Sequence, residues 1–455
     1  MEKLIKMKLL PMFKNVLGAV ILMISFGAAQ AQDTLQLDFR QAVEIALSKN
    51  LDYQIQSNQM EVLKRQKQSA FASHFPSANI GSSFQQQKGQ QFQQIEGEIV
   101  VTNVTNEIVS SGLSLNMPIF NSGRRILDTQ SSKLSYMAGE KGLERAAQQV
   151  IFDVSRRYLQ VLLDGELFRI AQENLDNQKQ QLEQITGFVD AGLRTLSDQY
   201  NQESEVARLE SVALRAQVQL ENDLWTLSEY LQLEPTVIPD LDPVDPLATT
   251  ITFDGLTVNE LYELAKESRS DLDQQEMLVE SAQKSVKAMK AMYFPRINAF
   301  YNYNTFFTSL DDRTLREQLL KIYPQQNYGL SLQIPIFNNL QNKLEVGRRK
   351  VAYQNQILQK ESLDRKVFQD VKLAYINYQA AVRNEKNTQV QVLAAEEAQK
   401  AVSERFRLGL SNFVDLSTAN QQLVAAQADQ AQAVYTLYFQ EVLMKHALGT
   451  LNIEF

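Results

Sequence analysis

The spacing of apolar residues along the chain predicts long helices interrupted by a few strands. In Leu37–Ser73, for example, Phe39, Val43, Ala46 and Leu47 fall on one helical face, with polar residues elsewhere. Six segments are expected to be helical: about 37–73, 123–188, 195–232, 258–292, 339–408 and 412–448. At 1.5 Å per residue the two longest would each extend roughly 100 Å. The fold class indicated by this pattern is therefore mainly α.

A period of two replaces the helical period in four places, which predicts strands with one apolar and one polar face. We expect two strands within about 77–120 and two within about 296–337. The clearest apolar positions are Leu113, Leu115, Met117 and Ile119, and later Tyr328, Leu330, Leu332, Ile334 and Ile336. Asp311–Gln325, between the last two strands, has the composition of a charged loop.

The order of elements occurs twice, which indicates an internal duplication. The stretch Asp190–Asp198 has the same form as Arg405–Thr418, and both contain a glycine followed by an aspartate. A shift of 217 positions relates Gly192 to Gly409 and Asp198 to Asp415. We therefore expect twin hairpin tips, with a first repeat over 32–232, a linker over 233–256 and a second repeat over 257–455.

The first residues are typical of a secretory signal peptide over 1–31. Four lysines precede an apolar stretch of about 13 residues, which is too short to span a bilayer, and Ala29–Ala31 is a cleavage site. The formal net charge is −8, and removing the four lysines and one glutamate of this segment makes it −11. An acidic, exported chain is a poor candidate for nucleic-acid binding.

Composition excludes several kinds of chemistry. The chain has no cysteine, and its two histidines, His74 and His446, are isolated in the sequence and expected to be structural. No phosphate-binding glycine loop, histidine-based triad or metal cluster is recognisable. We therefore expect no catalytic residue, no cofactor and no metal site.

The strands match those of membrane barrels, in which each backbone group must be paired. Four strands cannot enclose a pore, so several chains must contribute. Aromatic residues and prolines mark the junctions between helices and strands, as an interfacial girdle or as ordinary core residues. They are Phe75, Pro76, Pro118, Phe120, Phe294, Pro295, Pro335 and Phe337.

These features together resemble the TolC family of outer-membrane efflux channels over essentially the whole mature chain. The resemblance rests on the repeated Phe-Pro junctions, the strands ending Gly-Leu-Ser-Leu-Asn-Met-Pro-Ile-Phe120 and Gly-Leu-Ser-Leu-Gln-Ile-Pro-Ile-Phe337, Tyr-Leu-Gln-Val-Leu-Leu163 and Gly-Leu-Ser-Asn-Phe-Val-Asp-Leu416. It implies a homotrimer with a 12-stranded β-barrel in outer-membrane lipid, four strands per chain, above a helical tunnel in the periplasm. The implied partners are a periplasmic adaptor and an inner-membrane pump.

The resemblance also implies roles at the tips. Asp198 and Asp415 match acidic gate positions, Arg194 occupies the place of a linking arginine, and Gly192, Leu193, Gly409 and Leu410 form the turns that meet the adaptor. The chain departs from the family at Ser411 and Thr418, where a linking arginine and a second acid are expected. The two aspartates also fit helix capping, and both roles are compatible.

The function expected from the sequence is a passive export duct for an efflux or secretion system. A duct for type I protein secretion is an alternative within transport. A soluble periplasmic coiled-coil scaffold is an alternative from another class, although it leaves the four strands unexplained.

Overall fold

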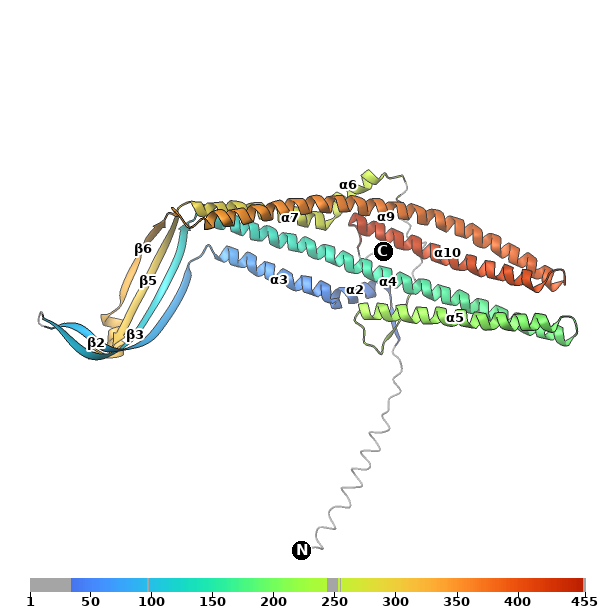
Figure 1. Ribbon diagram of the computed structural model, residues 1–455, viewed down its shortest axis with the longest axis horizontal. Coiled ribbons are helices and arrows are strands. Elements are labelled where there is room, and N and C mark those ends of the chain that lie inside the picture. The colour runs from blue at the N-terminus through green and yellow to red at the C-terminus, as the bar shows by residue number, and fades with distance from the viewer. Residues whose placement is uncertain (1–33, 96–97, 244–252, 254, 453–455) are drawn as a thin grey trace, which may run out of the picture.

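The computed structural model describes residues 34–95, 98–243, 253 and 255–452. The expected signal peptide lies outside these residues. Helices run side by side along most of the length of the molecule, and a four-stranded sheet projects at an angle from one end (Figure 1). Among the described helices, none is both long and apolar enough to cross a membrane.

Two helical hairpins dominate the fold. The first consists of α4 (Arg124–Asp190) and α5 (Leu196–Tyr230), and the second of α9 (Gln341–Arg407) and α10 (Phe413–Leu448). The helices α4 and α9 have 67 residues each, and their first residues are also related by the shift of 217 positions. Figure 1 shows the tips of both hairpins together at the end opposite the sheet.

Two of the predicted helices, those that precede the strands in each half of the chain, are broken in the structure. Instead of one helix over 37–73, the structure has α2 (Phe39–Lys49) and α3 (Leu51–Ala72). Asn50 is extended between them and caps α3 by accepting the backbone N–H of Tyr53 at 2.9 Å. Instead of one helix over 258–292, it has α6 (Val258–Ser268), α7 (Ser270–Lys290) and η1 (Ala291–Tyr293).

The break before α7 is held by charged side chains rather than by a local cap. Arg269 has an extended backbone conformation and a buried side chain. Its Nη1 donates to the carbonyl of Ala447 at 3.2 Å. Arg145 similarly donates to the carbonyl of His446 at 3.0 Å. Asp271 pairs with both arginines, at 2.6 Å and 3.7 Å. Positive groups at the end of α10 compensate the partial negative charge of its last carbonyls, which fixes this helix to both repeats.

The helix α4 lies at the centre of the sheet-proximal half, and its glycines allow close packing there. A side chain at Gly139 would collide with Leu63 of α3, and one at Gly142 with Gln274 of α7. The helix α4 continues through both glycines, where side chains of α3 and α7 lie against its backbone.

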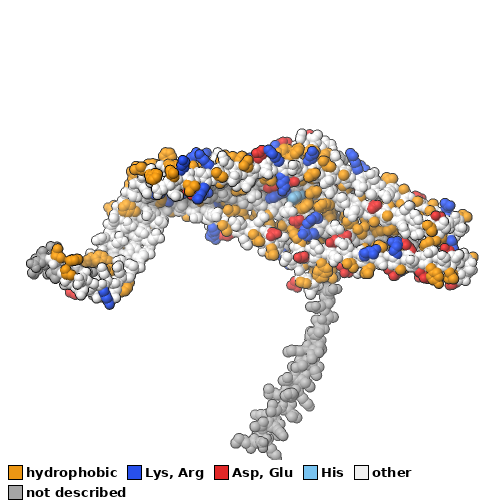
Figure 2. Space-filling view, in the orientation of Figure 1, with side chains coloured by type: hydrophobic (Ala, Val, Ile, Leu, Met, Phe, Trp, Pro, Cys, Tyr) orange, Lys and Arg blue, Asp and Glu red, His pale blue; other side chains and the backbone are white. Residues whose placement is uncertain are grey.

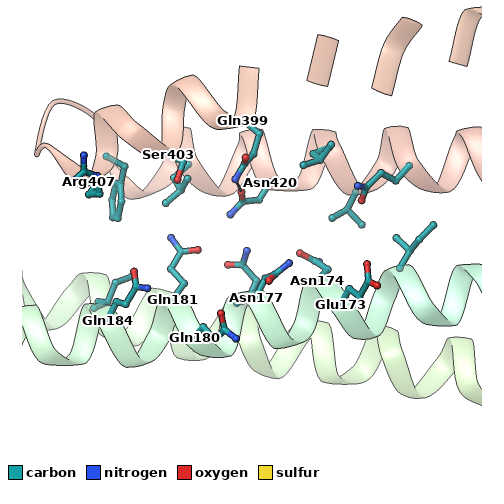
Figure 3. A pocket seen from close by; sticks show the side chains of 18 of the residues that line it. Glu173, Asn174, Asn177, Gln180, Gln181, Gln184, Gln399, Ser403, Arg407 and Asn420 are labelled. Atoms are coloured by element: carbon teal, nitrogen blue, oxygen red, sulfur yellow. Dashed lines mark hydrogen bonds between the residues drawn. The ribbon is translucent and has the colours of Figure 1, made fainter. Parts of the chain in front are cut away.

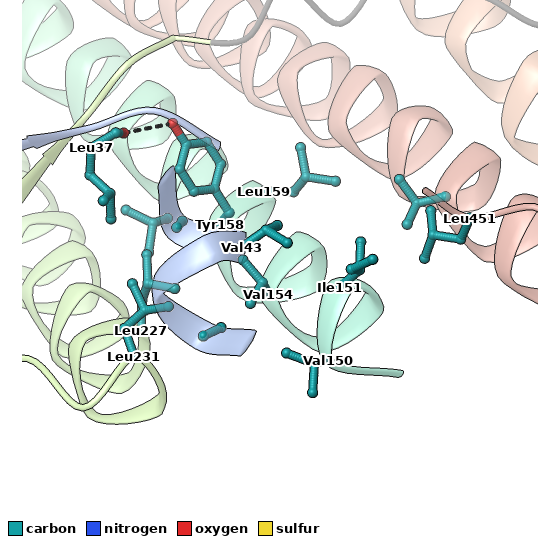
Figure 4. Close-up of a cluster of buried hydrophobic side chains, with 14 of the residues drawn as sticks. Leu37, Val43, Val150, Ile151, Val154, Tyr158, Leu159, Leu227, Leu231 and Leu451 are labelled. Carbon is teal, nitrogen blue, oxygen red and sulfur yellow. Dashed lines mark hydrogen bonds between the residues drawn. The ribbon is translucent and has the colours of Figure 1, made fainter. Parts of the chain in front are cut away.

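A small parallel sheet joins the N-terminal segment to the middle of the chain. The strand β1 (Thr34–Leu37) pairs with β4 (Ile238–Leu241), so the expected linker over 233–256 contains a strand. Tyr158 is fully buried below this pair, and its hydroxyl donates to the carbonyls of Leu37 and Asp242 at 3.1 and 2.8 Å. The largest apolar core surrounds Tyr158 and draws on α2, α4, α5 and α10 (Figure 4).

The four remaining strands form an antiparallel sheet in the order β2-β3-β5-β6. They span Ser77–Ile95, Glu98–Phe120, Arg296–Thr308 and Gln325–Gln333. The first two strands lie within the predicted range 77–120. The last ends before the predicted position, since residues 334–337, including Pro335, lie outside it. Proline has no backbone N–H to offer a neighbouring strand.

The register aligns the apolar positions of the strands on one face. Leu115 is paired with Tyr301, which is paired in turn with Tyr328, and Ile297 is paired with Leu332. Serines, asparagines and glutamines occupy most of the opposite face. The segment between β5 and β6, expected to be a loop, contains α8 (Leu315–Glu317) and the π-helix η2 (Gln318–Ile322).

Candidate functional site at the helical tips

Both tips are built by the same turn. Gly192 and Gly409 have φ angles of 74° and 76°, a left-handed conformation that glycine adopts without steric cost. Leu193 and Leu410 each donate their backbone N–H to the carbonyl five residues earlier, at 2.8 Å. This is the Schellman arrangement that ends a helix. It leaves Leu193 and Leu410 with exposed fractions of 72% and 67% at the outermost points of the tips.

The two aspartates lie in the first turn of the returning helices. Asp198 accepts the N–H and the hydroxyl of Thr195 at 3.3 and 3.0 Å, completing a capping box at the start of α5. Asp415 accepts the hydroxyl of Ser411 at 2.9 Å, and Asn412 caps α10 through the N–H of Asp415. Ser411 therefore contacts the acid of its own tip, at the position where the family resemblance suggested a linking arginine.

Arg194 joins the first tip to the second hairpin. Its Nη2 donates to the carbonyl of Phe406 at 2.9 Å, and its guanidinium lies 4.2 Å from the centre of the Phe406 ring. That carbonyl is among the last of α9, where a positive charge is favourable. Ile185, Phe406 and Leu416 form a buried apolar cluster beside this contact. The sequence indicated Arg194 but not its partner, because Phe406 is 212 residues away.

A polar groove separates the two hairpins just above the tips. Its volume is about 560 Å³, and Figure 3 shows amide side chains from both hairpins directed toward one another across it. Gln399 of α9 and Asn420 of α10 are hydrogen-bonded at 3.0 Å. The labelled polar residues are Glu173, Asn174, Asn177, Gln180, Gln181 and Gln184 from α4, and Gln399, Ser403, Arg407 and Asn420 opposite. Their amides offer both donors and acceptors to an occupant.

Buried carboxyls form a second electrostatic feature, which the sequence did not reveal. Asp164 of α4 is 5% exposed, and Gln160 donates to its oxygens at 3.2 and 3.3 Å. Burial and a hydrogen bond with Asp223 of α5 hold the pKa of Asp164 well above its usual range. Burial also raises the pKa of Glu441 on α10 to about 7, although Lys445 opposes this shift.

The junction residues expected at the membrane boundary lie at the end of the sheet nearest the helices. All four aromatic side chains are exposed within one chain: Phe75, Phe120, Phe294 and Phe337. At Pro118 the pairing of β3 with β5 shifts register before Phe120. The carbonyl of Pro118 accepts Arg125, and that of Pro295 accepts Ser122, at 3.3 and 3.2 Å. Pro76 and Pro335 lie at strand ends, outside β2 and β6.

The tips and junctions hold no metal-type cluster. Across the described part of the chain, no group of three or more His, Cys, Asp or Glu side chains is arranged to hold a metal ion. At the end of the molecule opposite the sheet, hydrophobic, acidic and basic side chains lie close together on the surface (Figure 2).

Comparison with known proteins agrees with this geometry. The outer membrane protein TolC of Escherichia coli K12 is 22% identical over 356 residues, covering 77% of this chain and 71% of TolC. The probable outer membrane lipoprotein SilC of Salmonella typhimurium is 22% identical over 411 residues, covering 89% and 84%.

Solved structures show the same fold. The outer-membrane channel OprN aligns with a TM-score of 0.76 at 21% identity, covering 90% of each chain. CusC aligns with a TM-score of 0.77 at 18% identity, covering 93% of this chain and 95% of CusC. The fold inferred from the sequence, long-helix hairpins with a small sheet, is thereby confirmed.

A model of the family described as outer membrane efflux protein matches residues 42–231 and 261–450. The unmatched residues between these two segments include β4. The resemblance drawn from the sequence motifs is confirmed: this chain belongs to the outer membrane efflux protein family.

Proposed function

We propose that this protein is the outer-membrane channel of a multi-part efflux system. In this proposal three copies form one passive duct, whose sheet end lies in the membrane and whose tips meet an adaptor in the periplasm. The observation that carries the proposal is the polarity of the molecule. An exposed apolar sheet face lies at one end, and two equivalent charged tips lie at the other, roughly 100 Å of helix away.

The apolar sheet face is suited to lipid. Ile80 and Leu332 are 85% and 63% exposed, and Leu330 and Tyr328 on the same face are also exposed. Soluble monomers rarely expose a continuous apolar patch of this kind. The alternation of this face with a polar one is the pattern of strands in outer-membrane barrels. A soluble scaffold would leave it without a partner.

The free edges of the sheet require other copies. The strands β2 and β6 form the two edges, and in hydrocarbon their unpaired backbone groups would each cost several kcal/mol. The two edge strands run in opposite directions. The strand β6 of one copy can therefore pair antiparallel with β2 of the next, and repeating this contact three times closes a ring.

The helices below the sheet support the same contact. The helix α3 leads into β2, and α9 follows β6, so closure brings α3 of one copy beside α9 of its neighbour. Both helices carry exposed apolar residues. They are Leu51, Ile55 and Val62 on α3, and Leu344 and Val351 on α9. These residues would be covered in the assembled trimer.

At the tips we propose the gate and the adaptor contact. Three chains would bring six carboxylates, from Asp198 and Asp415, to one narrow opening, where like charges repel and cations gather. Arg194 would hold the two hairpins of each chain together in the closed state. The exposed Leu193 and Leu410, with the amide groove behind them, would meet a periplasmic adaptor that serves an inner-membrane pump.

The proposal is tested by disulfide trapping between the sheet edges, because the chain has no cysteine of its own. Ile80→Cys on β2 is combined in turn with Tyr328→Cys, Leu330→Cys or Leu332→Cys on β6. All four positions share the apolar face. One of these three pairs should match the register between the two chains. For that pair, oxidation of outer-membrane fractions should give a ladder of linked chains that stops at three.

A matched control replaces the β6 position by Ser331→Cys, whose side chain lies on the opposite face. It should link poorly to Ile80→Cys at each register. Absence of linkage at all three apolar positions, or a ladder that continues past three, would show that the chain does not close a trimer through these edges.

A further inference from the structure

The connection between β5 and β6 is fastened to the end of β5. Gln318 is fully buried, and its Oε1 accepts the backbone N–H of Thr308 at 3.0 Å. Its Nε2 donates to the carbonyls of Thr308, Asp311 and Arg313 at 3.2, 3.0 and 2.7 Å. The paired part of β6 reaches only Asn304 of β5. The amide of Gln318 therefore replaces the missing neighbouring strand at Thr308.

This anchoring places an aromatic ring over the polar face of the sheet. Tyr323 stacks on Phe306, with ring centres 4.2 Å apart and planes inclined by 20°. Side chains alternate between faces along a strand, so Phe306 shares the polar face with Asn302 and Asn304. Tyr323 thus forms a second layer above that face.

An ion pair holds the second layer in place. The hydroxyl of Tyr323 donates to Asp311 at 2.6 Å, and Arg313 pairs with Asp311 at 2.6 Å. The guanidinium of Arg313 also lies 3.3 Å from the Tyr323 hydroxyl and 5.7 Å from the centre of its ring. The Tyr323 ring therefore lies on the Phe306 ring, and the charged pair of Asp311 and Arg313 holds its hydroxyl.

The neighbouring part of the polar face carries smaller side chains than the stack. A hollow of about 660 Å³ lies beside the stack, with Phe306 and Tyr323 among its lining residues. The residues of β2 and β3 that line it on this face are small or short: Asn79, Gly81, Ser83, Ser110, Gly112 and Ser114. Phe306 and Tyr323 have the largest side chains among the residues that line this hollow.

We propose that this stack, made of Phe306, Tyr323, Arg313 and Asp311, forms a second constriction at the outer mouth of the channel and limits the size of molecules that pass. The proposal rests on the proposed function, because closing the sheet with its apolar face toward lipid turns the polar face toward the lumen. Three copies then direct three stacks inward at one level. Twelve strands enclose a lumen narrower than that of a porin, so side chains two rings deep occupy a large share of it.

The test uses a single cysteine placed below the constriction. Asn302→Cys lies on the polar face of β5, nearer the helices than Phe306. Intact cells are treated from outside with a small hydrophilic maleimide or with a bulky polyethylene-glycol maleimide. The small reagent should label Asn302→Cys in each background. The bulky reagent should label it several-fold faster when Tyr323→Ala or Phe306→Ala is also present.

Two matched variants separate the contributions of the stack. Tyr323→Phe keeps the ring but loses the hydroxyl contacts with Asp311, and it should retain much of the exclusion. Lys88→Cys, on the exposed part of β2, should react equally with both reagents in every background. Trimers on unheated gels show that each variant has assembled.

The possible failures point to different conclusions. If the small reagent reacts but the bulky one labels Asn302→Cys equally fast with and without the rings, there is no outer constriction. If the small reagent reacts with Lys88→Cys but not with Asn302→Cys in assembled trimers, the polar face does not line an outward-open lumen. That second result contradicts the proposed function itself.

Discussion

At the scale of single residues, the buried carboxyls are the least expected feature of the helical part. Asp164 and Asp223 lie on the two helices of the first hairpin and share a hydrogen bond. Burial and this hydrogen bond favour the protonated form of Asp164, so the contact between α4 and α5 depends on pH at this point.

The raised pKa of Asp164 predicts that the folded protein is more stable in mild acid than in mild alkali. The folded pKa of Asp164 is raised above the unfolded value of about 3.9, so its contribution is fully present below that value. As pH rises from the unfolded pKa to the raised folded pKa of Asp164, the free energy of unfolding falls by up to about 1.4 kcal/mol per pH unit. Above the folded pKa this stabilisation is lost. Asp164→Asn should flatten the decline in thermal midpoint between pH 5 and pH 8.

Glu441 provides the comparison for this measurement. Its pKa is also raised by burial, so Glu441→Gln should remove a separate part of the pH dependence. Parallel melting curves for the parent and Asp164→Asn across this range would contradict a shared proton at the α4–α5 contact.

At the scale of elements, the register of the sheet places the apolar residues of its strands on one face. The pattern of Leu330 and Leu332 against Ser331 is visible in one strand, and the register extends it across all four. Phe300 and Phe306 are exceptions on the polar face. The ring of Phe300 lies over Gly329, whose missing side chain leaves room for it.

The two faces predict opposite responses to a charge. Leu332→Arg or Tyr301→Arg should cost about 2–4 kcal/mol near the middle of the bilayer, because the guanidinium would enter lipid. Ser331→Arg and Asn302→Arg should cost little, because in the proposed barrel these side chains face a water-filled lumen. The yield of folded trimer in outer-membrane fractions measures the difference, and equal yields of all four variants would refute the assignment of faces.

At the scale of the whole molecule, the two hairpins place two similar tips at the end opposite the sheet. Gly192 with Asp198 and Gly409 with Asp415 follow helices of identical length. The tips are not identical in their contacts, because Arg194 reaches across to Phe406, whereas Ser411 contacts Asp415 of its own tip. Of these two contacts, the one made by Arg194 joins the two hairpins of a chain, and the one made by Ser411 does not.

Replacing both aspartates tests whether the tips form the gate. Asp198→Ala combined with Asp415→Ala should leave trimer assembly nearly intact, because an acid in the first helical turn stabilises by only about 0.3–1 kcal/mol. In planar bilayers, single-channel conductance should change, and block by divalent or trivalent cations from the periplasmic side should weaken.

The single replacement Thr195→Ala is a suitable control for the gate. It removes the capping hydroxyl of α5 but keeps the carboxylate of Asp198. It should retain cation block if charge is responsible. Unchanged block and conductance in the double aspartate variant would leave capping as the role of both residues.

The sequence alone determined the features that depend on neighbouring residues. The helical period gave α4 and α9 within a few residues of their ends, and alternation gave the strands and their faces. The tips were also predictable, because Gly192, Thr195 and Asp198 act within one turn of chain. In each case the physical cause is local: backbone preference, capping or the period of side chains.

Only the tertiary structure decided the contacts between distant segments. The break at Arg269 has no local cap and depends on the carbonyl of Ala447. The charged segment after β5 is ordered because Gln318 pairs with the free edge at Thr308. Arg194 found its partner on the other hairpin, and Asp164 acquired its raised pKa from burial against α5. Such effects arise when folding removes water and brings remote groups together, which neither periodicity nor composition records.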